Sequence, residues 1–156
     1  FAKKSIEVRR RALEAASPLS LPEVKQAITE AYQGSDSRLR ISSVYAMGRN
    51  TDTRWFPTLV RELESDDGEM RYEAAHACGE IADRRAAPYL IPLMDDPDPQ
   101  VQLSAIGALG KVGGTLARRA LRTRLHDPDE RLRQAVEVAL EELDANLDPL
   151  RFEIGS

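Results

Sequence analysis

Residues 95 to 113, DDPDPQVQLSAIGALGKVG, join a turn of aspartates and prolines to an apolar segment that ends in glycine. A phosphate-binding loop also joins a turn to a helix through glycine, and its backbone N–H groups hold the phosphate oxygens. That chemistry further needs a Gly-Lys-Ser or Gly-Lys-Thr sequence, which this stretch does not contain. We therefore interpret the stretch as the junction between two helices and not as a nucleotide site.

Other catalytic and metal-binding motifs are missing from the sequence. It contains no His-Glu-x-x-His, no Cys-x-x-Cys and no Gly-x-Ser-x-Gly, and its histidines are His76 and His126 alone. A zinc site or a Ser-His-Asp triad needs these residue types in such arrangements. We expect no catalytic residue, no metal and no cofactor.

The composition is that of one globular domain over residues 1–156, with 42% hydrophobic and 31% charged residues. A net charge of -4 disfavours nucleic-acid binding through overall positive charge. The single cysteine, Cys78, excludes an internal disulfide, and no apolar run reaches the length of a membrane span. We expect a cytoplasmic protein that does not bind membranes.

A repeat of 31 residues organises the helices that would position any site. An apolar side chain recurs at the positions Val8, Leu39, Met70, Val101 and Leu132. Further apolar or small residues follow it at the fourth, seventh and eighth positions, which share one face of an α-helix. We call this helix A and assign the repeats roughly to residues 5–35, 36–66, 67–97, 98–128 and 129–156.

Each helix A has predicted start and stop signals. Aspartates that can cap the helix N-terminus recur at Asp36, Asp67, Asp98 and Asp129. Glycines interpreted as the helix C-terminus stand at Gly48, Gly79 and Gly110. A second helix, helix B, follows with a core column at Ile28, Leu59, Leu90 and Leu121.

The pattern Asp-Pro-Asp-Pro-x-Val-x-x-x-Ala-x-x-Ala-Leu-Gly-x-Val resembles the HEAT-like repeats first grouped with phycobilisome lyases, over nearly the whole chain. The resemblance implies an all-α, right-handed α-solenoid of about five helix pairs, with the B helices lining the concave face. It also implies a pair between a turn aspartate and an arginine of the next helix A, here Asp127 with Arg133. At the matching places Asp96 faces Gln102, and Arg71 faces Ser65, so that Arg71 must use Asp66 or nothing.

Enzymes built from such repeats match poorly. Deoxyhypusine hydroxylase resembles this chain most at MRYEAAHACGEI, but the metal-binding His-Glu pair is replaced by Tyr72 and Glu73. His76 shares its column with Glu14, Tyr45, Gly107 and Val138, and we interpret it as an edge position. HEAT-like DNA glycosylases use several aromatic and basic residues on their concave face, whereas this chain has one tryptophan. No residue marks the bilin pocket of a phycobilin lyase.

Both ends carry pieces of the pattern. Phe1 lies 31 residues before Tyr32 and fits the last core column of a preceding helix B, and Phe152 lies 31 residues after Leu121. Stacked repeats need capping units at their ends. We therefore expect an excerpt of a longer protein, or a frayed terminus at each end.

Two surface features could bind a partner. The stretch Lys111 to Arg124 has five basic and no acidic residues, and it either binds phosphate or acidic groups or is balanced by Glu137, Glu141 and Glu142. Trp55 and Tyr89 are either partner anchors or packing between repeats.

We therefore expect a non-enzymatic scaffold that binds an unidentified protein segment on the concave face. The alternatives are a phycobilin-lyase-like or other enzyme subunit and, more weakly, nucleic-acid binding through Lys111 to Arg124. The predicted partner-binding residues are Arg54, Trp55, Arg61, Arg85, Tyr89, Leu93, Arg118, Arg122 and Arg124.

Overall fold

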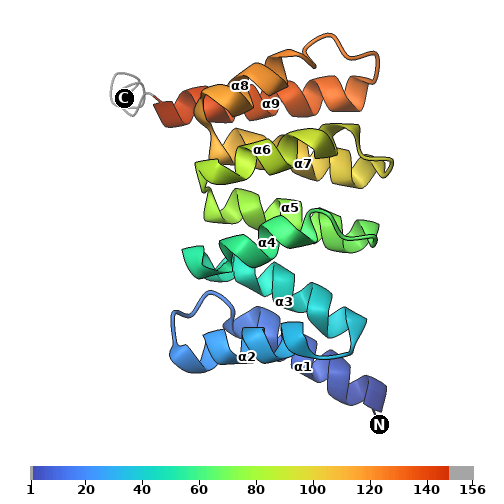
Figure 1. The fold of residues 1–156 in the computed structure, drawn as a ribbon, viewed down its shortest axis with the longest axis vertical. Helices are drawn as coiled ribbons and strands as arrows, with labels where there is room; N and C mark the ends of the chain where they lie inside the picture. The colour runs from blue at the N-terminus through green and yellow to red at the C-terminus, as the bar shows by residue number, and fades with distance from the viewer. Residues whose placement is uncertain (1, 148–156) are drawn as a thin grey trace.

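The computed structural model describes residues 2–147, and all regular structure in that range is helical. The helices stack in two layers along one axis (Figure 1). The A layer consists of α1 (Ala2–Ala16), α3 (Ser37–Asn50), α5 (Gly68–Ile81), α7 (Pro99–Val112) and α9 (Glu130–Leu147). The B layer consists of α2 (Pro22–Gln33), α4 (Phe56–Glu62), α6 (Ala87–Leu90) and α8 (Gly114–Arg122). The predicted all-α stack of helix pairs is confirmed.

Each A helix from α3 onward begins at the predicted aspartate. The carboxylate of Asp36 accepts the backbone N–H groups of Arg38 and Leu39, both at 3.0 Å. The other three aspartates each accept the N–H two residues further on, at 2.9 Å. These bonds satisfy donors that the first helical turn leaves without a partner, so the caps fix where each helix starts.

The predicted stop signal was wrong by three residues. Gly48, Gly79 and Gly110 lie inside their helices. The residues that end these helices share a positive φ, and they are Thr51 at 56°, Ala82 at 58° and Gly113 at 67°. Thr51 and Ala82 have the left-handed helical conformation, whereas Gly113, with a ψ of -163°, does not. Of the three, only Gly113 is of the residue type that a positive φ favours.

The three buried glycines instead let neighbouring A helices come close together. A Cβ atom on Gly48 would lie 2.7 Å from the Cα of Ala77, and one on Gly110 would lie 2.8 Å from the Cα of Ala139. At Gly79 the corresponding distance to the Cα of Ala108 is 3.0 Å. Any side chain at these positions would push two backbones apart, so glycine sets the spacing of the A layer.

The B layer is built differently. Its helices are short, and 3-10 turns extend them at Thr53–Trp55, Arg84–Ala86 and Ile91–Asp95. Pro92 has no N–H group and its ring disfavours continuation of the α-helix, so α6 is a single α-turn between two 3-10 turns. Large side chains fill the space between the layers, and Leu59, Leu90 and Leu121 are fully buried.

The turn aspartates and arginines pair in an unexpected direction. Arg71 makes two hydrogen bonds, at 2.8 and 3.1 Å, to the carboxylate of Asp96, which lies in the turn at the end of the same repeat, and it donates to the backbone oxygen of Ser65 at 2.8 Å. The prediction that Arg71 has only Asp66 to use was therefore wrong. Arg133 contacts Asp127 as predicted, but it donates to the backbone oxygen at 2.8 Å and not to the carboxylate.

The predictions for the two ends stay untested. Phe1 and Phe152 lie outside the described residues.

Candidate partner-binding faces

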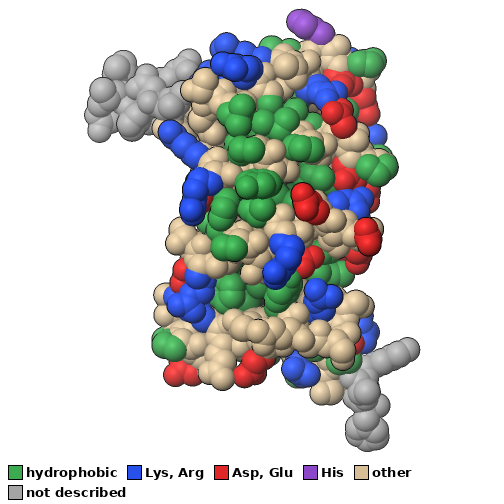
Figure 2. Space-filling view, in the orientation of Figure 1, with side chains coloured by type: hydrophobic (Ala, Val, Ile, Leu, Met, Phe, Trp, Pro, Cys, Tyr) green, Lys and Arg blue, Asp and Glu red, His purple; other side chains and the backbone are tan. Residues whose placement is uncertain are grey.

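The outward side of the B layer, which we call the B face, carries the predicted site. Figure 2 shows hydrophobic side chains in a band over α4, α6 and α8, with Lys and Arg side chains beside it. Of the nine predicted residues, five are exposed, and these are Arg54, Arg61, Arg85, Tyr89 and Arg122.

Trp55 is not a partner anchor. Its side chain is only 6% exposed, and the indole N–H donates to the side-chain oxygen of Asn50 at 3.1 Å. The Asn50 amide in turn donates to the backbone oxygens of Ser17 and Leu19 at 2.9 and 3.1 Å. Trp55 therefore connects the second repeat to the first, which is the packing alternative. The sequence held a signal for packing, because the residues in the same column, Val24, Ala86 and Ala117, are all apolar. The structure buries these three as well.

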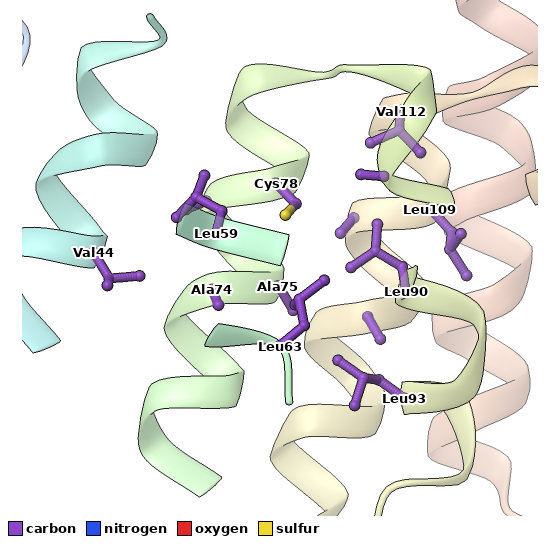
Figure 3. Packing of buried hydrophobic residues seen from close by; sticks show 14 of the residues in the cluster. Val44, Leu59, Leu63, Ala74, Ala75, Cys78, Leu90, Leu93, Leu109 and Val112 are labelled. Carbon is purple, nitrogen blue, oxygen red and sulfur yellow. The ribbon is translucent and has the colours of Figure 1, made fainter. Parts of the chain in front are cut away.

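Leu93 is also a core residue. It is 9% exposed and lies in the buried cluster next to α7 (Figure 3). Its place in the 3-10 turn Ile91–Asp95 explains the error, since a 3-10 helix turns 120° per residue where an α-helix turns 100°. The α-helical pattern therefore placed Leu93 on the wrong side.

The basic stretch is partly neutralised. Arg118 lies 2.5 Å from the carboxylate of Asp144, Arg124 pairs with Asp95, and Lys111 lies 4.0 Å from Glu80. Three of the five basic residues thus face carboxylates, and these are not the predicted Glu137, Glu141 and Glu142. Within residues 5–146, Arg119 and Arg122 are exposed and form no ion pair.

Several exposed side chains lie on the third and fourth B helices, α6 and α8, and on the 3-10 turn before α6. Tyr89 is 47% exposed and Leu116 is 45% exposed. The guanidinium of Arg85 stands 4.5 Å from the centre of the Phe56 ring and also pairs with Asp83 at 2.6 Å. Arg85 is therefore held in place by the neighbouring repeat while much of its side chain faces solvent.

The outward side of the A layer, the A face, was not predicted as a site. Its rows include Tyr45 and His76 in one column and Tyr72 and Leu103 in another, and these side chains are half-buried. Gly107, in the column of His76, leaves a hollow between α5 and α7. The sequence shows that glycine replaces larger residues in this column. It does not show whether the missing side chain leaves a hollow or whether the position is exposed and accepts any residue type.

The two layers differ in spacing. Successive A helices contact each other closely along their lengths, whereas the backbones of successive B helices make few close contacts. The expectation that the B helices line the concave face stays a prediction.

The metal-ligating side chains and the shifted pKa values of the described part of the chain bear on whether it could be catalytic. No cluster of three or more metal-ligating side chains occurs there. Burial raises the pKa of the Cys78 thiol to about 12, which keeps it protonated and a poor nucleophile. Burial, reinforced by the charges of Glu69 and Glu14, raises the pKa of Glu73 to about 7. Over residues 2–147 no helix combines the length and apolarity that crossing a bilayer requires.

Comparison with solved structures supports the fold. The chain is similar to one in the structure of the complex of CpcE and CpcF of phycocyanin lyase from Nostoc sp. PCC7120, with a TM-score of 0.74 and 24% identity over 88% of this chain and 59% of that chain. It is also similar to an engineered protein, with a TM-score of 0.63 and 22% identity over 87% of this chain and 72% of that one. An archaeal HEAT-like repeats protein from Thermococcus onnurineus NA1 gives a TM-score of 0.52 and 17% identity over 81% and 62% of the two chains.

These identities show a shared fold and no more, and the chain spans 59% of the length of the Nostoc chain. A comparison with curated proteins gave no match. A family profile described as HEAT repeats matches residues 56–141, more than half of the chain. Together with the stacked helix pairs, this match shows that the chain belongs to the HEAT repeat family.

Proposed function

We propose that this chain is a non-enzymatic scaffold that binds an acidic, amphipathic segment of another protein on its B face. The observation that carries the proposal is that Tyr89 and Leu116, on successive B helices, are exposed together with the arginines Arg85, Arg119 and Arg122. Tyr and Arg are enriched at the energetic centres of protein interfaces, where an apolar anchor is surrounded by polar contacts. The similar Nostoc structure is itself a complex of two chains.

The local charge favours an acidic partner. The chain carries a net charge of -4, but Arg119 and Arg122 have no carboxylate partner among the described residues. A partner carboxylate could therefore pair with them without displacing an internal ion pair. Arg118 and Arg124 are already paired with Asp144 and Asp95, so they contribute less.

The test is a binding titration with a defined probe. A fluorescent helical peptide with Leu and Trp on one side and Glu on the other is titrated against the chain, beside a peptide in which each Glu is replaced by Lys. We expect Tyr89→Ala and Arg122→Ala each to weaken binding of the acidic peptide about tenfold. Arg38→Ala and Gln134→Ala, on the A helices, are the controls and should bind like the wild type.

Two outcomes would contradict the proposal. The first is equal affinity for the acidic and basic peptides. The second is loss of binding in the two A-helix variants while the B-face variants bind normally.

A role as a lyase subunit is a second candidate, and it is supported only by the similarity to the Nostoc complex. Co-purification of a tetrapyrrole, detected by its visible absorbance, would favour it. Nucleic-acid binding is less well supported, because Lys111, Arg118 and Arg124 lie near carboxylates. A duplex DNA titration with steep salt dependence would favour it.

A further inference from the structure

A hollow on the A face is created by one missing side chain. In the column Glu14, Tyr45, His76, Gly107 and Val138, the fourth residue has none. A Cβ atom on Gly107 would meet nothing within 4 Å. The hollow measures about 250 Å³, and Tyr72, His76, Leu103 and Lys111 are among its lining residues. This volume suits one side chain of a partner better than a whole small ligand.

A second hollow adjoins the first on the A face. It measures about 320 Å³ and is lined by Gly68, Glu69, Tyr72, Glu73, Asp98 and Gln100. Tyr72 and Gln100 line both hollows, so the two are contiguous. The first is lined by aromatic and apolar groups at its centre, whereas the second carries three carboxylates.

The charges of the second hollow are not balanced within the described residues. The carboxylates of Glu69 and Glu73 form no ion pair there. The basic side chains of the first hollow already face another carboxylate, because Glu80 lies 3.8 Å from His76 and 4.0 Å from Lys111. Half-burial and the neighbouring Glu69 and Glu14 oppose ionisation of Glu73, so a positive charge brought from outside would stabilise the site.

We propose that the A face between α5 and α7 is a second binding surface, which takes a basic segment of a protein partner. The segment places an apolar or aromatic side chain in the hollow at Gly107 and directs a Lys or Arg toward Glu69 and Glu73. This occupant is opposite in charge to the one proposed for the B face, and the inference does not rest on that proposal. One chain could thereby hold two different segments on opposite sides.

The test compares three helical peptides that differ at two positions one helical turn apart. They carry Phe with Arg, Phe with Glu, and Ala with Arg. The wild-type chain should bind the Phe and Arg peptide about tenfold more tightly than either of the others. The preference for Phe over Ala then reports on the hollow at Gly107, and the preference for Arg over Glu reports on the hollow lined by Glu69 and Glu73.

Two variants assign the preferences to their hollows. Gly107→Tyr places in this column the residue that position 45 already carries, and it should abolish the preference for Phe over Ala. Glu73→Gln keeps the shape of the side chain and removes its charge, so it should reduce the preference for Arg over Glu about fivefold. Tyr89→Ala on the B face is the matched control and should leave both preferences unchanged.

The inference is overturned if the wild-type chain shows neither preference. It is also overturned if Gly107→Tyr and Glu73→Gln, shown by circular dichroism to be folded, keep both preferences.

Discussion

The A layer and the B layer of this molecule are held together by opposite means. In the A layer, glycine and alanine let backbones approach until a Cβ atom would be too large, as at Gly48 against Ala77. In the B layer, the backbones stand further apart and fully buried leucines such as Leu59 and Leu90 fill the space. The difference teaches that one 31-residue unit can specify two different helix spacings through the size of its side chains.

The two faces differ in charge as well. Within the described part of the chain, Arg119 and Arg122 place positive charge without an ion-pair partner on the B face, whereas Glu69 and Glu73 place negative charge without one around the second hollow of the A face. A chain of small net charge can therefore present two surfaces that select different partners.

The largest expected effect comes from shortening a buried side chain in the B layer. Leu90 is fully buried, so Leu90→Ala removes a side chain from a site that cannot collapse completely, and it should lower the free energy of unfolding by about 2–5 kcal/mol. Arg85→Ala, on the same segment but exposed, should change it by less than about 1 kcal/mol. Urea denaturation measures both. Equal effects would show that the helical phase assigned to the B layer is wrong.

The converse change adds a side-chain atom to the A layer at a position where two helices are in close contact. Gly48→Ala forces a Cβ atom against the backbone of Ala77, and the overpacking should lower the free energy of unfolding by about 1–3 kcal/mol. Alanine would thus be too small for the B layer and too large for the A layer.

Gly107→Ala is the control for that prediction, because the added Cβ meets no atom within 4 Å. It should raise the free energy of unfolding by about 0.5–1 kcal/mol through helix propensity. If both glycine variants were stabilised, the close approach of the A helices would not be what requires glycine at position 48.

Much of the fold could be predicted because its signals are local. The capping aspartates bond to backbone groups two or three residues away, so the sequence spacing alone locates the helix starts. The role of the glycines could not be read in this way. A glycine near a helix end is compatible with a left-handed cap or with a close contact, and only the neighbouring helix distinguishes them.

The candidate site was less predictable for a related reason. Arg85, Tyr89 and Arg122 are exposed as expected, but Trp55 and Leu93 are buried. Prolines and 3-10 turns change the rotation of the B segments, so a constant α-helical angle misplaces residues along them. The pairing of Arg71 with Asp96 was missed because the family pattern pairs each arginine with the turn before its helix, whereas Asp96 lies in the turn at the other end of the repeat.

The last expected effect concerns the carboxylates of the A face and depends on pH. The pKa of Glu73 is raised from an ordinary 4.5 to about 7 by burial and by the charges of Glu69 and Glu14. The folded chain therefore binds more protons than the unfolded chain between these values, so this group lowers the stability as the pH rises from about 4.5 to about 7. Above that window the ionised carboxylate opposes folding.

Glu73→Gln should consequently match the wild type near pH 5 and exceed its free energy of unfolding near pH 8 by about 1 kcal/mol, a figure reduced for partial exposure to water. Denaturant titrations at the two pH values measure the difference. Glu64→Gln, an exposed carboxylate outside both hollows, is the matched control and should show no such dependence. A Glu73→Gln variant that is equally stable relative to the wild type at both pH values would contradict the view that this carboxylate carries an unbalanced charge on the A face.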